Sequence, residues 1–230
     1  MPLNTQRLQK TIHTLLAPGK GILAADESSG TIKKRFASIN LESTEGSRRD
    51  YRDMLLTTKE YEKFISGVIL YDETVDQKSR NGITFSRLIH DRGVTPGIKT
   101  DEGKEEHPFW NPQTVTRGLD GLGKRLQEYT ERSQGTLGFT KWRQVILVDP
   151  PPSDAFLDYA MHVMAEQAAW SLQQSYVPIC EPEVLMDGRA QKMLKTIYER
   201  TETGSVVRVA RLLSEFQDVM GKGLLSELAA

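Results

Sequence analysis

Five short apolar segments, separated by helical patterns, constrain the fold of this chain more than any other feature. Each segment is rich in β-branched residues and apolar on both faces, which is typical of a strand buried in a parallel sheet. The segments span residues 21–25, 67–71, 94–98, 145–148 and 177–180. Strands that alternate with helices in this way predict an α/β fold with a parallel sheet and right-handed connections.

Apolar residues at helical spacing mark three helices. One precedes the first strand, one follows the third strand, and one begins after the prolines at 150–152, where Ser153 or Asp154 is expected to cap it. Residues 100–116 are expected to form a long loop without secondary structure. The three apolar stripes are Leu8, Ile12, Leu15 and Leu16, then Leu119, Leu122, Leu126 and Tyr129, and finally Phe156, Ala160, Val163 and Met164.

Charged residues follow or adjoin most of the predicted strands. Carboxylates follow the first strand (Asp26), the second (Asp72) and the fifth (Glu181). Lys99 follows the third strand, and Lys141 stands where the fourth is expected to begin. In a (β/α) barrel the carboxyl ends of the strands converge on one mouth, so four of these groups are expected to meet at one site. The alternative is that each charge is only the first solvated residue after a strand.

Lysines close to carboxylates favour one kind of chemistry. A lysine with a lowered pKa can attack a carbonyl and form a Schiff base, while a neighbouring carboxylate transfers protons. Spacing alone does not identify which lysine would react. Residues 28–35, with the sequence Ser-Ser-Gly-Thr-Ile-Lys-Lys-Arg, follow the first strand and could bind a phosphate at a helix start. The alternative is a helix cap followed by a solvated basic face.

Charge and composition exclude several other classes of protein. Thirty basic and 31 acidic residues give a net charge of -1, and no aromatic residues are interleaved with the short basic stretches, so nucleic-acid binding is not expected. A single cysteine, Cys180, and four scattered histidines do not suggest a metal site or a disulfide within the chain. No membrane span or apolar signal core is apparent, so we expect a cytoplasmic protein.

Six motifs resemble those of one known family, the class I, Schiff-base-forming fructose-bisphosphate aldolases. They occupy residues 19–28, 67–74, 97–101, 118–122, 141–143 and 177–183, and the resemblance extends over residues 8–188. It implies a TIM-type (β/α) barrel, incomplete here because the family barrel has eight strands and this chain shows five. It also implies reversible aldol cleavage of fructose 1,6-bisphosphate to glyceraldehyde 3-phosphate and dihydroxyacetone phosphate in glycolysis, without a cofactor.

The resemblance assigns roles at the matching positions. Asp26 is expected to handle protons during carbinolamine formation and carbon–carbon cleavage. Glu181 is expected to act as general acid and base with Glu183 as its orienting neighbour, and Lys141 is expected to lie beside the substrate hydroxyls. The residues expected to bind substrate or phosphate are Ser28, Thr31, Lys34, Arg35, Lys99 and Arg143.

One departure from the family bears on activity. The family's Schiff-base lysine lies on strand six in a Leu-Lys-Pro-Asn type segment, and these 230 residues contain no such segment. Either Lys141 or Lys99 takes over Schiff-base formation, or the chain is an inactive, truncated aldolase-like protein that binds sugar phosphate or partner subunits. A third alternative is an incomplete gene product without a stable fold.

The C-terminal residues show a different sequence pattern. Val206, Val209, Leu213, Phe216 and Met220 form one amphipathic stripe, and no strand-like segment follows Cys180. We therefore expect an aldolase-like partial barrel over residues 1–188 and a helical C-terminal tail over residues 189–230. The first and fifth strands would be open edges, so we expect the tail helix to cover part of the exposed surface and copies of the chain to form a homo-oligomer.

Overall fold

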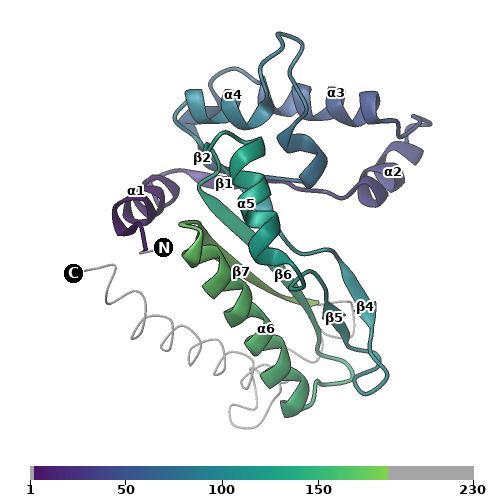
Figure 1. Ribbon diagram of the computed structural model, residues 1–230. Helices are drawn as coiled ribbons and strands as arrows, with labels where there is room; N and C mark the ends of the chain where they lie inside the picture. The colour runs from purple at the N-terminus through teal and green to yellow at the C-terminus, as the bar shows by residue number, and fades with distance from the viewer. Residues whose placement is uncertain (1–2, 186–230) are drawn as a thin grey trace. The chain divides into compact units, whose positions relative to one another are not determined.

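The structure, a computed structural model, describes residues 3–185 (Figure 1). The helix expected around residues 206–220 and the tail region 189–230 lie outside the described residues. The chain divides into two compact units, which we describe separately. The described part of unit 1 comprises residues 3–100, 123–141 and 171–179, and that of unit 2 comprises residues 101–122, 142–170 and 180–185.

A five-stranded sheet is the central element, as the sequence predicted. Its strands are β1 (Gly21–Ala25), β2 (Ile65–Leu70), β3 (Thr95–Lys99), β6 (Phe139–Leu147) and β7 (Val177–Leu185), in the order β1-β2-β3-β6-β7. β1 pairs with β2, β2 with β3, and β3 with β6, each in parallel. Parallel neighbours with helices between them confirm the α/β class.

Three predictions about the strands were wrong. β7 continues to Leu185, so Glu181 lies within the fifth strand and does not follow it. β6 begins at Phe139, two residues before Lys141, where the strand was expected to begin, and six before the apolar segment 145–148, because the polar residues Lys141, Arg143 and Gln144 interrupt its apolar pattern. β1 is also not buried on both faces, since only Ala25 of its five residues is buried and Ile22 is exposed. β1 stands at the edge of the sheet, and β2 is the only strand within residues 3–185 that pairs with it.

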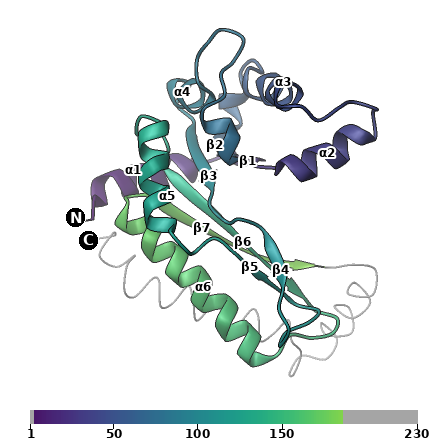
Figure 2. The ribbon, with the colours of Figure 1, turned by 45° about the vertical axis from the view of Figure 1, so that its right-hand side comes forward.

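The loop predicted over residues 100–116 instead contains a small antiparallel ribbon in unit 2 (Figure 2). β4 (Lys104–Glu106) pairs with β5 (Thr114–Thr116). The main chain closes the base of the ribbon, because the Glu102 N–H donates to the Arg117 carbonyl at 2.8 Å and the Arg117 N–H donates to the Gly103 carbonyl at 2.9 Å. The β-branched residues at 114–116 favour a strand, and they are the sequence signal that could have predicted β5.

The three predicted helices are present. They are α1 (Thr5–Leu15), α5 (Leu122–Arg132) and α6 (Asp154–Gln173), although Leu119 precedes α5. Ser153 rather than Asp154 caps α6, since its Oγ accepts from the Phe156 N–H at 3.2 Å. The remaining helical elements are α2 (Ser29–Ala37), α3 (Glu45–Leu56), η1 (Tyr61–Lys63), η2 (Asp72–Val75) and α4 (Phe85–Asp91).

The core of unit 1 lies against the carboxyl half of β2 and the start of β6. Leu15, Ile69 and Phe139 are buried together, with Val177 and Ile179 packed against them. No helix between residues 3 and 185 combines the length and the hydropathy that crossing a membrane requires.

Candidate active site

A buried ion pair joins the first and fourth strands of the sheet in unit 1. Asp26 directly follows β1, and Lys141 is the third residue of β6. Lys141 Nζ donates to Asp26 Oδ2 at 3.0 Å, and the two side chains are only 8% and 10% exposed. Burying charges of opposite sign is tolerable only where they pair, as these two do.

Lys99 lies beside this pair. It is the last residue of β3, and the sheet register places its Cα opposite that of Lys141. The Thr100 N–H donates to the Lys141 carbonyl at 3.0 Å, which fixes the main chain at this position. Unit 1 therefore brings together three of the predicted residues, one carboxylate and two amines, where β1 and β3 end and where Lys141 stands on β6.

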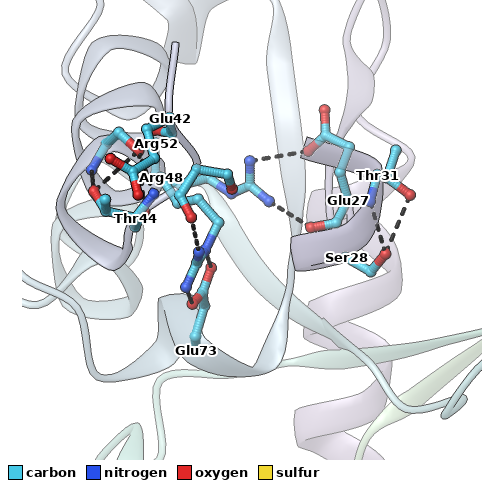
Figure 3. Close-up of polar contacts among 10 residues, drawn as sticks. Glu27, Ser28, Thr31, Glu42, Thr44, Arg48, Arg52 and Glu73 are labelled. Atoms are coloured by element: carbon cyan, nitrogen blue, oxygen red, sulfur yellow. Dashed lines mark hydrogen bonds and ion pairs between the residues drawn. The ribbon is translucent and has the colours of Figure 1, made fainter. Parts of the chain in front are cut away.

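The predicted phosphate-binding residues lie on α2, immediately after Asp26. Ser28 caps the helix, because its Oγ accepts from the Thr31 N–H at 3.3 Å, and it also lies 3.1 Å from the Thr31 hydroxyl (Figure 3). Lys34 and Arg35 are exposed in the last turn. The helix cap that sequence reasoning offered as the alternative is thus present, and the phosphate-binding role remains a prediction.

Glu27, which sequence reasoning left without a role, holds three side chains in unit 1. Its carboxylate pairs with Arg35 and accepts from the Tyr51 hydroxyl at 3.1 Å. On its other oxygen it pairs with Arg52 Nη1 at 3.0 Å, while Arg52 Nη2 donates to the Glu27 carbonyl at 2.9 Å. Burial and the neighbouring Glu27 raise the pKa of Tyr51, so the phenol stays protonated and donates.

A second arginine of α3 makes the matching contact at the end of β2. Arg48 Nε and Nη2 donate to the two carboxylate oxygens of Glu73 at 2.7 and 2.8 Å (Figure 3). The hydrogen bond to Glu73 raises the pKa of Arg48. Arg48 and Arg52 were missed, yet their spacing of four residues places them on one helix face, which is the sequence signal that could have found them.

Unit 2 holds the remaining predicted residues, Arg143, Glu181 and Glu183. Arg143 of β6 pairs with Glu183 of β7, and the Arg143 N–H donates to Asp101 Oδ2 at 3.3 Å. Glu181 stands two residues before Glu183 on β7, so both carboxylates project from the same face of the strand. Within residues 3–185, no three His, Cys, Asp or Glu side chains gather closely enough to hold a metal ion.

Comparison with known proteins identifies the family. Residues 7–225 match the family model of class-I fructose-bisphosphate aldolase. The chain belongs to the class-I fructose-bisphosphate aldolase family. The match confirms the resemblance carried by the motifs, and it extends along the chain beyond residue 188.

Curated aldolases are similar over most of the chain. A probable class 1 aldolase of Xanthomonas campestris is 44% identical over 203 residues, which cover 87% of this chain and 59% of that protein. Fructose-bisphosphate aldolase 2 of Plasmodium berghei is 41% identical over 220 residues, which cover 90% of this chain and 59% of that protein. The chain therefore spans somewhat more than half the length of these aldolases.

A solved aldolase structure shares the fold. Fructose-bisphosphate aldolase of Plasmodium falciparum, crystallised with TRAP and a small-molecule inhibitor, superimposes with a TM-score of 0.75 at 42% identity. The alignment covers 80% of this chain and 53% of that one. The five strands and their helices are thus an incomplete aldolase-type (β/α) barrel, which confirms the expected fold class.

Cys180 of β7 is not among the predicted catalytic or binding residues. Burial raises the pKa of its thiol to about 12. Below this pKa the thiol holds its proton, so the thiolate fraction at pH 8 is on the order of one in ten thousand. We expect iodoacetamide to alkylate Cys180 far more slowly in the folded chain than in urea, with a folded-state rate that rises toward pH 12. Equal rates in both states, measured by mass spectrometry, would contradict this.

Proposed function

We propose that this chain acts in the cytoplasm as a glycolytic lyase that reversibly cleaves fructose 1,6-bisphosphate to glyceraldehyde 3-phosphate and dihydroxyacetone phosphate. The observation that carries the proposal is the buried Asp26–Lys141 pair, with Lys99 opposite Lys141 in the sheet. An amine within hydrogen-bond reach of a carboxylate has a base that can accept its proton before it attacks a carbonyl. Family membership supports the choice of substrate.

The proposed steps use the side chains of unit 1. The phosphate group is held at α2 by the Ser28 and Thr31 hydroxyls and by Lys34 and Arg35, since a helix start and cations favour an anion. Lys141 passes a proton to Asp26, and the neutral amine attacks the C2 carbonyl to form a carbinolamine. Loss of water gives the iminium ion, which accepts the electron pair of the C3–C4 bond when that bond breaks.

The remaining steps restore the enzyme. The proton of the C4 hydroxyl leaves to a base as glyceraldehyde 3-phosphate departs, and the resulting enamine is protonated at C3. Hydrolysis of the iminium ion then releases dihydroxyacetone phosphate and regenerates the amine. In unit 2, Glu181 and Glu183 are proposed as the carboxylates that transfer these protons, and Arg143 as a further contact for the substrate.

Trapping with borohydride tests the proposal. Incubation with dihydroxyacetone phosphate and sodium borohydride is expected to add the mass of one ligand less one oxygen atom to Lys141, because reduction of the iminium ion leaves a secondary amine. Lys141→Met should abolish this adduct and Asp26→Asn should slow its formation. Lys124→Met is the control, since Lys124 lies exposed on α5 and pairs with Glu128 at the surface.

The position of the adduct decides between the lysines. Peptide mapping that places it on Lys99 would reverse the assignment of the nucleophile, and the absence of an adduct on any lysine would overturn catalysis through a Schiff base. A second candidate function is a non-catalytic sugar-phosphate-binding protein, in which the buried Lys141–Asp26 pair only stabilises the fold. Binding of dihydroxyacetone phosphate without an adduct would support it.

We also propose that copies of the chain associate. The exposed residues of β1 support this, because an uncovered strand edge presents backbone groups that another chain can pair with.

A further inference from the structure

The carboxylate of Glu27 lies between two arginines that differ sharply in exposure. The Arg52 side chain is 1% exposed, whereas the Arg35 side chain is 57% exposed. Glu27 itself is nearly buried, with 11% of its side chain exposed. Solvent therefore reaches Arg35. The charge of Arg52 instead pairs with Glu27 inside unit 1 (Figure 3).

The charges of these three residues sum to +1. Without Arg52, the Glu27 carboxylate would be balanced by Arg35 alone, and the pair would present no net charge to an anion near α2. With Arg52 in place, the buried pair is neutral and the charge of Arg35 remains available. Arg35 also keeps guanidinium N–H groups beyond the one that Glu27 takes, since a guanidinium carries five.

We infer that Arg52 is a positioning residue for phosphate binding: it neutralises and orients Glu27, so that Arg35 is held at α2 with its charge available to a phosphate group. The inference rests on the proposed function, because it assumes that Arg35 binds phosphate. Holding a long side chain in place before binding lowers the entropy lost when the ligand arrives. The hydrogen bond from Tyr51 to Glu27 Oε1 adds a second restraint on the same carboxylate.

Arg48 provides a matched control on the same helix. It is also an arginine of α3 that pairs with a carboxylate after a strand, but its partner is Glu73 and not Glu27. Loss of Arg48 removes an ion pair between α3 and η2 and leaves Glu27, Arg35 and Arg52 in place. A purely structural contribution of α3 would therefore appear in both variants, while the proposed effect belongs to Arg52.

The experiment measures the Kd for inorganic phosphate by isothermal titration calorimetry at low ionic strength, on the full chain. Arg52→Met and Arg35→Met are each expected to weaken binding about tenfold, or about 1.4 kcal/mol. Arg48→Met should stay within about twofold of the unaltered chain. Arg52→Lys, which keeps the charge, should recover most of the affinity.

Because Arg52→Met leaves a nearly buried carboxylate without its main partner, the variant could unfold. The double variant Glu27→Gln with Arg52→Met removes both charges, again leaves Arg35 with its own charge, and is expected to bind phosphate within about twofold of the unaltered chain. Its recovery separates the charge argument from a folding defect, which thermal melting of each variant checks independently.

The outcomes separate this inference from the function on which it rests. If Arg35→Met weakens binding but Arg52→Met does not, or if Arg52→Met and Arg48→Met weaken it equally, the role of Arg52 is overturned and the phosphate site stands. If the double variant folds but binds as poorly as Arg52→Met, the charge argument fails. If the unaltered chain binds no phosphate, or Arg35→Met binds it equally well, both the site and the inference are wrong.

Discussion

Replacing Asp26 with leucine is expected to lower the free energy of unfolding by about 3 kcal/mol. Lys141 Nζ lies 3.0 Å from Asp26 Oδ2, and both side chains are nearly buried. Removing one partner of a buried pair leaves the other charge without its compensation, and the cost of burying that charge then falls on the folded state. The same substitution should slow borohydride trapping, as expected for Asp26→Asn, because the base for the Lys141 amine is lost.

Denaturant unfolding measures this effect, and two further variants identify its cause. In the double variant Asp26→Leu with Lys141→Met, no buried charge is left uncompensated, so we expect most of the lost stability to return. The control is Asp91→Ala, which breaks an exposed pair with Arg87 on α4 and should cost less than about 0.5 kcal/mol. A cost below about 1 kcal/mol for Asp26→Leu would show that the pair is solvated rather than buried.

The strands that could be predicted from sequence are those whose apolar pattern is unbroken. β1 has the predicted bounds, and β2 and β3 differ from prediction by at most two residues at each end. The apolar segment 145–148 covers only the later part of β6, because the earlier part contains Lys141, Arg143 and Gln144, of which Lys141 and Gln144 are buried. The earlier part of the strand is thus the part that carries the candidate site, where function breaks the local pattern.

The candidate site was predictable as far as strand ends and motifs define it. That Asp26 and Lys99 lie at one edge follows from the rule that parallel strands of one sheet end together. Lys141 joins them because the register of β6 places it opposite Lys99. The sequence did not predict the partners of Glu27 and Glu73, because Arg52 and Arg48 belong to a helix and each lies 25 residues from its partner in the chain. Such a pairing depends on how α3 packs against the sheet, which no local pattern specifies.

Gly97→Val is expected to lower the free energy of unfolding by about 3 kcal/mol. In the sheet, Gly97 of β3 stands opposite Phe139 of β6, and the aromatic ring lies across the glycine. A Cβ at Gly97 would lie 2.5 Å from Cδ2 of Phe139 and closer still to two other ring carbons. Phe139 is fully buried, so its ring has no free space to move into, and the strands would have to separate.

Two comparisons isolate this steric effect in denaturant unfolding. Gly46→Ala is the control, because a Cβ there meets only the Thr44 hydroxyl oxygen at 3.8 Å within α3, and it should be neutral or stabilise the chain by up to about 1 kcal/mol. Combining Gly97→Val with Phe139→Leu should cost less than the sum of the two single changes, because the smaller side chain makes room for the new one. Strict additivity would contradict the proposed clash.

The consequences of Gly97→Val should reach the candidate site. The register that pairs Gly97 with Phe139 also pairs Lys99 with Lys141, two residues further along the same strands. A shift that relieves the clash therefore moves the two lysines relative to each other. In the Gly97→Val protein that remains folded, we expect borohydride trapping on Lys141 to be slower than in Gly46→Ala. An unchanged trapping rate would show that the amine and its carboxylate do not depend on this register.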